Sequence, residues 1–267
     1  MSFQNELTPL ATDIRGPVTS GHKIITWMLT INSDEPARLS WESNELPNGW
    51  RFTIEGVDMG TVGELPFNQG RYTMTITAMP LNSTITYNVV LQEGINLISV
   101  PLDPGETEGQ RWRLSELINF IGSGATMVIS YNKAEKKFFT YMPHFPHTSP
   151  VNTVVQGGEG YIVVMREPVS VTFTGTPWAG KVSLGAGLNL ISVPLKPSVE
   201  WRLSDLMSFI GKEATMVINY DKVEKKFFTY MPHFPHTSPV NTVVQGGEGY
   251  IVMMKAPVDV VFTGTMW

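Results

Sequence analysis

One segment of the sequence occurs twice, and this duplication constrains the fold more than any single motif. The run Asn96–Leu102 (NLISVPL) returns 93 residues later as Asn189–Leu195. Further along the offset is 89 residues, and Glu135–Val163 is identical to Glu224–Val252. The four lost positions fall in the polar loop Asp103–Arg111. Because a packed core tolerates length changes mainly in surface loops, the sequence predicts two copies of one folded module.

The duplication divides the chain into three predicted parts: a unique region at 1–86, a first module at 87–178 and a second module at 179–267. The identical stretch has two explanations. Two equal binding surfaces are maintained, or the duplication or a gene conversion is recent. The sequence leaves both open.

Composition excludes several function classes. The 19 basic and 24 acidic residues give a net charge of −5, which disfavours nucleic acid and anionic membrane surfaces as partners. The absence of cysteine excludes disulfides, thiolate nucleophiles and zinc knuckles. No apolar run reaches the length of a membrane helix, and Met1–Leu10 lacks the features of a signal peptide. We therefore expect no membrane insertion, and an exported protein would be present here as a mature fragment.

The unique region is predicted to be an immunoglobulin-like β-sandwich. Its β-branched and aromatic residues alternate in short segments separated by turn residues, a pattern typical of antiparallel strands. The candidate strands are Lys23–Ile31, Ala37–Trp41, Trp50–Ile54, Arg71–Ala78 and Thr84–Leu91. Packing of such strands in two sheets is the natural solution.

Each module is predicted to be a small α+β unit, mostly β with one helix. An apolar strand (Ile95–Leu102 or Leu188–Leu195) opens the module, and a helix follows, with Gly122 or Gly211 ending it in the left-handed conformation. Apolar residues at helical spacing carry this prediction: Leu114, Leu117, Ile118 and Ile121, and in the second copy Leu203, Leu206, Met207 and Ile210. A hairpin and two final strands complete the unit: Ala125–Tyr131, Lys136–Met142, Gly160–Met165 and Val169–Thr174. The connector Ala179–Gly187 is predicted to contain a strand of the second module.

These motifs resemble the tandem modules with a "GWNLIS.P" opening and a "G.GYW" strand that occur in large bacterial and archaeal surface and secreted proteins. The resemblance covers roughly residues 94–175 and 187–264. It implies an extracellular or cell-surface setting. Four positions depart from the pattern, because other residues stand where tryptophan is usual: Ile95, Leu188, Ile162 and Ile251. More weakly, the unique region is similar to the immunoglobulin-like modules that precede such repeats.

The loops Pro143–Pro150 and Pro232–Pro239 (PHFPHTSP) are the main candidate site. Their prolines predict an extended, polyproline-like path. Metal binding is disfavoured, because no third ligand is near in sequence. The alternatives are an exposed, stiff connector and a ligand platform for a sugar ring or peptide. The candidate ligand-binding residues are His144, Phe145, His147, His233, Phe234 and His236.

Other conspicuous residues have structural explanations. The tryptophans Trp112, Trp178, Trp201 and Trp267 would either extend the platform or pack in the core and between modules. Gly157–Gly160 is predicted to be a tight turn, with Glu159 solvated. The lysines of the hairpin tips are also predicted to be solvated: Lys133, Lys136, Lys137, Lys222, Lys225 and Lys226.

No catalytic motif is present in the sequence, and no nucleotide fingerprint. We therefore expect a protein without enzymatic activity, metal or cofactor. The first interpretation is a structural or display segment of a larger cell-surface or secreted bacterial protein. The alternative is an adhesion module that binds a carbohydrate, peptide or protein ligand through the repeated loops.

Overall fold

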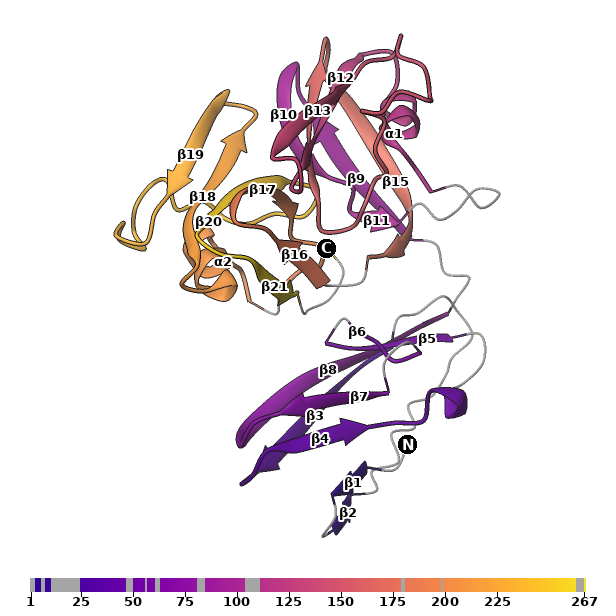
Figure 1. Cartoon of the computed structure of the whole chain (residues 1–267), viewed down its shortest axis with the longest axis vertical. Coiled ribbons are helices and arrows are strands. Elements are labelled where there is room, and N and C mark those ends of the chain that lie inside the picture. Colours follow the sequence, from indigo (N-terminus) through magenta and orange to yellow (C-terminus); the bar gives the residue numbers. More distant parts are fainter. Residues whose placement is uncertain are drawn as a thin grey trace. The chain divides into compact units, whose positions relative to one another are not determined.

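The structure of the chain is a computed structural model, and it is mainly β (Figure 1). It describes residues 3–5, 8–10, 25–46, 50–55, 57–60, 63–80, 85–103, 111–178, 181–197, 199–262 and 267. Most of the loop in which the two copies differ in length, residues 104–110, therefore lies outside the described residues. The chain forms two compact units, Met1–Ser83 and Thr84–Trp267, and each is described by itself.

The described residues of the first unit form three small sheets. Strands β3 (Ile25–Ser33), β8 (Gly70–Pro80), β5 (Trp50–Ile54) and β6 (Val57–Asp58) form one antiparallel sheet in that order. The other two sheets are two-stranded pairs, β4 (Ala37–Ser40) with β7 (Glu64–Phe67), and β1 (Phe3–Asn5) with β2 (Thr8–Leu10). A 3-10 turn, η1, spans Ser43–Glu45.

One apolar cluster connects the four-stranded sheet of this unit with β4. Leu39 lies in β4, and Trp41 comes directly after this strand. Both pack with Ile54 of β5 and Ile76 of β8. The indole Nε1 of Trp41 donates a 2.8 Å hydrogen bond to the carbonyl of Met59, so the buried ring has its polar group satisfied. Four of the five strands predicted for the unique region are present here, β5 with the predicted bounds and the other three with shifted ends.

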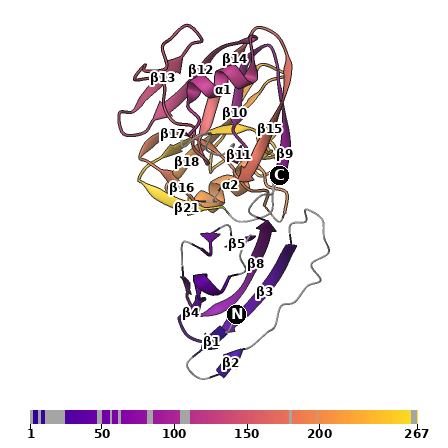
Figure 2. The same ribbon diagram turned by 90° about the vertical axis from the view of Figure 1, so that its right-hand side faces the viewer.

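The second unit contains the duplicated sequence as two matching four-stranded sheets (Figures 1 and 2). The first has the order β10 (Gly94–Ser99), β14 (Gly160–Met165), β12 (Ala125–Asn132) and β13 (Lys137–Tyr141). The second has the order β17 (Gly187–Ser192), β20 (Gly249–Met254), β18 (Ala214–Asp221) and β19 (Lys226–Tyr230). All neighbours are antiparallel.

Smaller sheets accompany the two four-stranded ones. Strand β15 (Val169–Pro177) lies between β9 (Ile85–Leu91) and β11 (Leu102–Asp103). In the second copy β16 (Lys181–Leu184) pairs with β21 (Val258–Val261). The prediction that the connector contains a strand of the second module is therefore confirmed.

Strand register also repeats between the two copies. Leu97 lies opposite Ile162 in the first sheet, and Leu190 lies opposite Ile251 in the second. Both sheets carry the same irregularity, between Ala125 and Met127 and at the equivalent place in the second copy.

Two predicted strands need correction. The apolar run that opens the first copy is not one strand, because β10 ends at Ser99 and β11 belongs to another sheet. Pro101 lies in this break and has no N–H to donate to a ladder. The segment assigned to the unique region as its last strand, β9, pairs along its whole length with β15 of the second unit.

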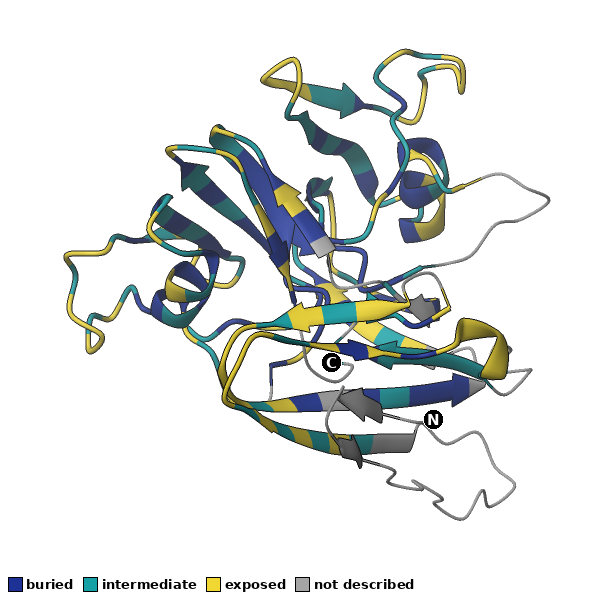
Figure 3. Cartoon of the chain, turned by 60° about the horizontal axis from the view of Figure 1, so that its bottom comes forward, coloured by how far each residue is buried: buried dark blue, intermediate teal, exposed yellow. Residues whose placement is uncertain are grey.

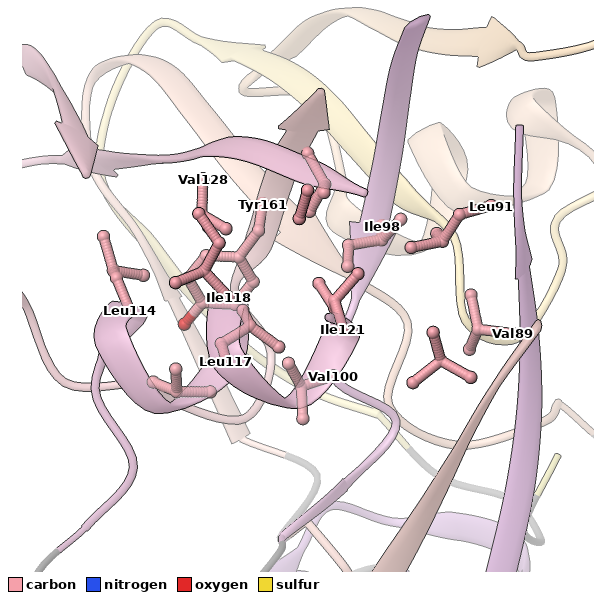
Figure 4. Packing of buried hydrophobic residues seen from close by; sticks show 14 of the residues in the cluster. Val89, Leu91, Ile98, Val100, Leu114, Leu117, Ile118, Ile121, Val128 and Tyr161 are labelled. Atoms are coloured by element: carbon pink, nitrogen blue, oxygen red, sulfur yellow. The ribbon is translucent and has the colours of Figure 1, made fainter. Parts of the chain in front are cut away.

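The helices form where predicted, α1 at Leu114–Ile121 and α2 at Leu203–Ile210. Gly122 follows α1 with φ 104° and ψ −175°, so the expected positive φ is present but the conformation is not the left-handed helical one. Figure 4 shows the apolar residues of α1 facing Val128 and Tyr161 of the sheet and Val89 and Leu91 of β9. Burial of this helix face is what stabilises so short a helix.

Each copy closes its own core. The buried cluster of the first copy contains residues between Val89 and Phe173 only, and that of the second contains residues between Val182 and Phe262. Buried residues are concentrated in the strands and helices, and exposed residues lie both in the connecting loops and at positions along the strands (Figure 3). No helix in the part of the chain that the structure describes is long and apolar enough to cross a membrane.

Candidate functional site

The loop Pro143–Pro150 is a series of turns and not an extended segment. The amide of Phe145 donates to the carbonyl of Met142 at 2.9 Å, and that of Ser149 donates to the carbonyl of Pro146 at 2.9 Å. The polyproline-like path predicted from the sequence is therefore wrong. Proline presets φ for a turn as well as for an extended helix, and here short-range hydrogen bonds within the loop close the turns.

The loop is anchored by Asn152, which is 2 % exposed. Its Nδ2 donates to the carbonyl of His147 at 2.9 Å and to Oγ of Ser115 at 3.0 Å. Its Oδ1 accepts a 2.9 Å bond from the backbone amide of Ser115 in the first turn of α1. One buried amide thus caps the helix and fixes the backbone of the candidate loop.

Sequence reasoning missed this anchor. The only signal for it was indirect, because Arg113, which precedes the helix, has no side-chain oxygen to act as an N-cap. The backbone amide of Arg113 donates a 2.8 Å hydrogen bond to Oε2 of Glu116.

The candidate residues of the loop differ in exposure. His144 and His147 are exposed, and Phe145 is half-buried and packs against the core cluster. The Phe145 ring lies at 86° to the ring of Tyr141 and at 83° to that of His144. These rings do not share a plane, so they do not form the flat platform considered for a sugar ring.

The second loop repeats this geometry. Asn241 binds the amide of Ser204 and the carbonyl of His236, at 2.9 and 2.8 Å. The Phe234 ring lies at 84° to Tyr230 and at 75° to His233. The assignment of a ligand site to the six His and Phe residues stays a prediction.

A histidine of the first loop contacts an acidic residue of helix α1. Nδ1 of His147 lies 3.5 Å from Oε1 of Glu116, and both side chains are more than a third exposed. A contact of this exposure contributes little to stability. Among the described residues no group of three or more His, Cys, Asp or Glu side chains is placed to hold a metal ion.

The tryptophans pack inside their own copies and do not extend the loops. Nε1 of Trp178 donates to the carbonyl of Val100 at 2.8 Å, and Nε1 of Trp267 donates to that of Val193 at 2.7 Å. Trp112 packs edge-on against Phe120, with ring centroids 4.9 Å apart.

The Gly157–Gly160 segment is a turn, as predicted, and Gly158 has φ 77°. Glu159, however, is not solvated, because its side chain is only 25 % exposed and lies 3.7 Å from Nζ of Lys133, itself 23 % exposed. Burial raises the pKa of the Glu159 carboxyl, and Lys133 opposes this shift. Burial also raises the pKa of Tyr161, whose hydroxyl accepts a 2.9 Å bond from the amide of Gln156.

The prediction that the lysines of the hairpin tips are solvated is also wrong for Lys133. Its Nζ donates to the carbonyl of Ser183, in the second copy, at 2.9 Å. Lys136 and Lys137 are exposed. Glu248 and Lys222 repeat the pair of Glu159 and Lys133, at 4.0 Å, and burial also raises the pKa of Glu248.

Comparison of the chain with protein-family models, with curated proteins and with solved structures found no match.

Proposed function

We propose that this chain is a non-catalytic structural or display segment of a larger cell-surface or secreted bacterial protein. In this proposal an immunoglobulin-like β-sandwich is followed by two tandem modules. The resemblance of the modules to repeats of surface and secreted proteins supports the setting, and the mainly β structure is compatible with it.

The observation that carries the proposal is how the two loops are held. A buried asparagine, Asn152 or Asn241, binds the backbone of each loop and also caps a helix. Exposed histidines are presented on backbone that is fixed by turns. Two identical exposed loops on two closed cores are an arrangement suited to display, since the exposed side chains contribute little to the stability of the core.

Antibody labelling of cells of the source organism tests the setting. Antibodies raised against the purified chain should label intact cells as strongly as permeabilised cells, and protease treatment of intact cells should remove the signal. Labelling that requires permeabilisation would contradict a surface location.

A second candidate function is binding of a glycan or protein ligand through the loops. The exposure of His144, His147, His233 and His236 on fixed backbone favours it, because a preorganised loop loses little conformational entropy on binding. Glycan and peptide arrays should then retain the wild-type chain. They should not retain the variant in which these four histidines are alanine.

The matched control for the arrays is the variant Lys136→Ala/Lys225→Ala. It changes two exposed residues of the hairpin tips and leaves the loops intact. Equal retention of the histidine variant and this control would exclude the loops as the ligand site.

A further inference from the structure

The two copies of the duplicated sequence contact each other through a reciprocal interface. The amide of Ser99 donates to the carbonyl of Gly247 at 3.0 Å, and the amide of Ser192 donates to the carbonyl of Gly158 at 3.0 Å. Ser192 is the repeat equivalent of Ser99, and Gly247 that of Gly158. Exchange of the two copies therefore converts each of these hydrogen bonds into the other.

The contacts made by lysine across the interface are also reciprocal. Nζ of Lys133 donates to the carbonyl of Ser183, and Nζ of Lys222 donates to the carbonyl of Val90, both at 2.9 Å. Ser183 is equivalent to Val90. Because the acceptors are backbone carbonyls, the difference between the Ser and Val side chains does not change this contact.

The apolar part of the interface is built from equivalent pairs. Three residue positions, each present in both copies, form one cluster, which contains Leu97, Leu190, Tyr131, Tyr220, Ile162 and Ile251. These side chains belong to neither of the two closed cores. The interface thus joins two complete modules rather than two parts of one core.

Close backbone approach explains one glycine in each copy. A Cβ added at Gly160 would lie 2.7 Å from the carbonyl oxygen of Ile191, and one added at Gly249 would lie 2.7 Å from that of Ile98. Neither contact is within a module. Glycine at these positions is therefore required by the partner module.

An interface in which the same patch is used on both sides is isologous, and such a patch fits a second copy of itself. We propose that this face, defined by Leu97, Lys133, Gly158, Gly160 and their equivalents in the second copy, is a self-recognition surface. Its partner is a module of the same kind in a second copy of this chain. Within one chain the connector only raises the effective concentration of the two faces.

One position makes the two faces unequal. Tyr87 and Val89 lie nearest to a Cβ added at Gly247, whereas Val182 lies nearest to one added at Gly158. The sequence has Gly180 where the first copy has Tyr87. A pair of first modules would contain this tyrosine contact twice and a pair of second modules would lack it. We therefore expect the first module to pair with itself more tightly.

The test starts from the folded full chain with a protease site inserted between Trp178 and Lys181. Cleavage yields an N-terminal fragment, with the first unit and first module, and a C-terminal fragment with the second module. After incubation, native mass spectrometry should detect three species: pairs of N-terminal fragments, pairs of C-terminal fragments and mixed pairs. Pairs of N-terminal fragments should outnumber pairs of C-terminal fragments.

Two results would overturn the proposal. Mixed pairs alone would show that each face recognises only the other module, and separate fragments would show that the contact depends on the connector. In the cleaved Gly160→Ala/Gly249→Ala variant, all three pairs should be lost.

Gly185→Ala is the control for this substitution, since an added Cβ there meets atoms only at the ordinary contact distance of 3.9 Å. The cleaved Gly185→Ala variant should form the same three kinds of fragment pair as the cleaved wild type. If the double glycine variant does not fold, Lys133→Met/Lys222→Met provides the second test, and all three kinds of pair should become less abundant in it. Unchanged pairing in this lysine variant would contradict the proposed surface.

Discussion

The side chain of Asn152 caps a helix that begins far from it in sequence, because its Oδ1 accepts a 2.9 Å hydrogen bond from the backbone amide of Ser115. The same side chain donates to the carbonyl of His147. Helix α1 and the candidate loop therefore depend on one buried amide, and their stabilities are coupled.

Replacement of Asn152 by alanine should lower the free energy of unfolding by about 2–3 kcal/mol, since it removes a helix cap and leaves buried polar groups unpaired. Chemical denaturation measures this loss. Asn152→Asp is the control, because it keeps the acceptor for Ser115 but removes both donors. It should still support the helix while amide hydrogen exchange in the loop increases. Equal exchange in the loop of wild type and Asn152→Asp would contradict the coupling.

Replacement of the four loop histidines by alanine should change stability by no more than about 0.5 kcal/mol, as is typical of exposed sites. Addition of a chelator to the wild type should leave its thermal midpoint unchanged. If the histidines bound a structural ion, its binding energy would be folding energy. A fall of more than about 10 °C on chelation, well beyond the few degrees that 1 kcal/mol produces, would identify a metal site.

The carboxyls of Glu159 and Glu248 should make stability depend on pH. Burial, the largest cause, raises both pKa values above 4.5, so the folded state binds these protons more tightly than the unfolded state. The resulting stabilisation is complete below pH 4.5 and is lost as pH rises through the raised pKa values.

The variant Glu159→Gln/Glu248→Gln measures this effect. Relative to it, the wild type should gain stability as the pH falls from neutral to 4.5, which urea unfolding across this range would detect. Parallel pH profiles of the two proteins would show that these carboxyls do not carry the dependence.

Replacement of Lys133 by methionine should destabilise the contact between the two copies. The change removes the bond to the carbonyl of Ser183 and leaves the half-buried Glu159 without its cation. We expect a loss of about 1.5–3 kcal/mol, the range for hydrogen bonds to charged groups, measured by thermal unfolding. Lys136→Met, at an exposed position of the same hairpin, should have no measurable effect. Equal midpoints for the two variants would exclude a structural role of Lys133.

Much of the local structure follows from the sequence because local patterns carry it. The spacing of Leu114, Leu117, Ile118 and Ile121 predicts a helix where α1 is found, and the strand predicted at Gly160–Met165 is β14. Val182 and Leu184, at the repeat positions of Val89 and Leu91, predict that the connector contains a strand, and β16 is found there. These features depend on residues that are close in the chain.

Only the tertiary structure decided which of those elements pair and which polar side chains are buried. Asn152 reads as an ordinary loop residue until α1 is placed beside it, and Lys133 and Glu159 read as solvated until the other copy covers them. The proline-rich loop turns through short-range hydrogen bonds, and Asn152, which binds its backbone, connects it to α1. The physical reason is common to Asn152, Lys133 and Glu159: desolvation and hydrogen bonding depend on neighbours in space, and the local pattern of a sequence does not contain those neighbours.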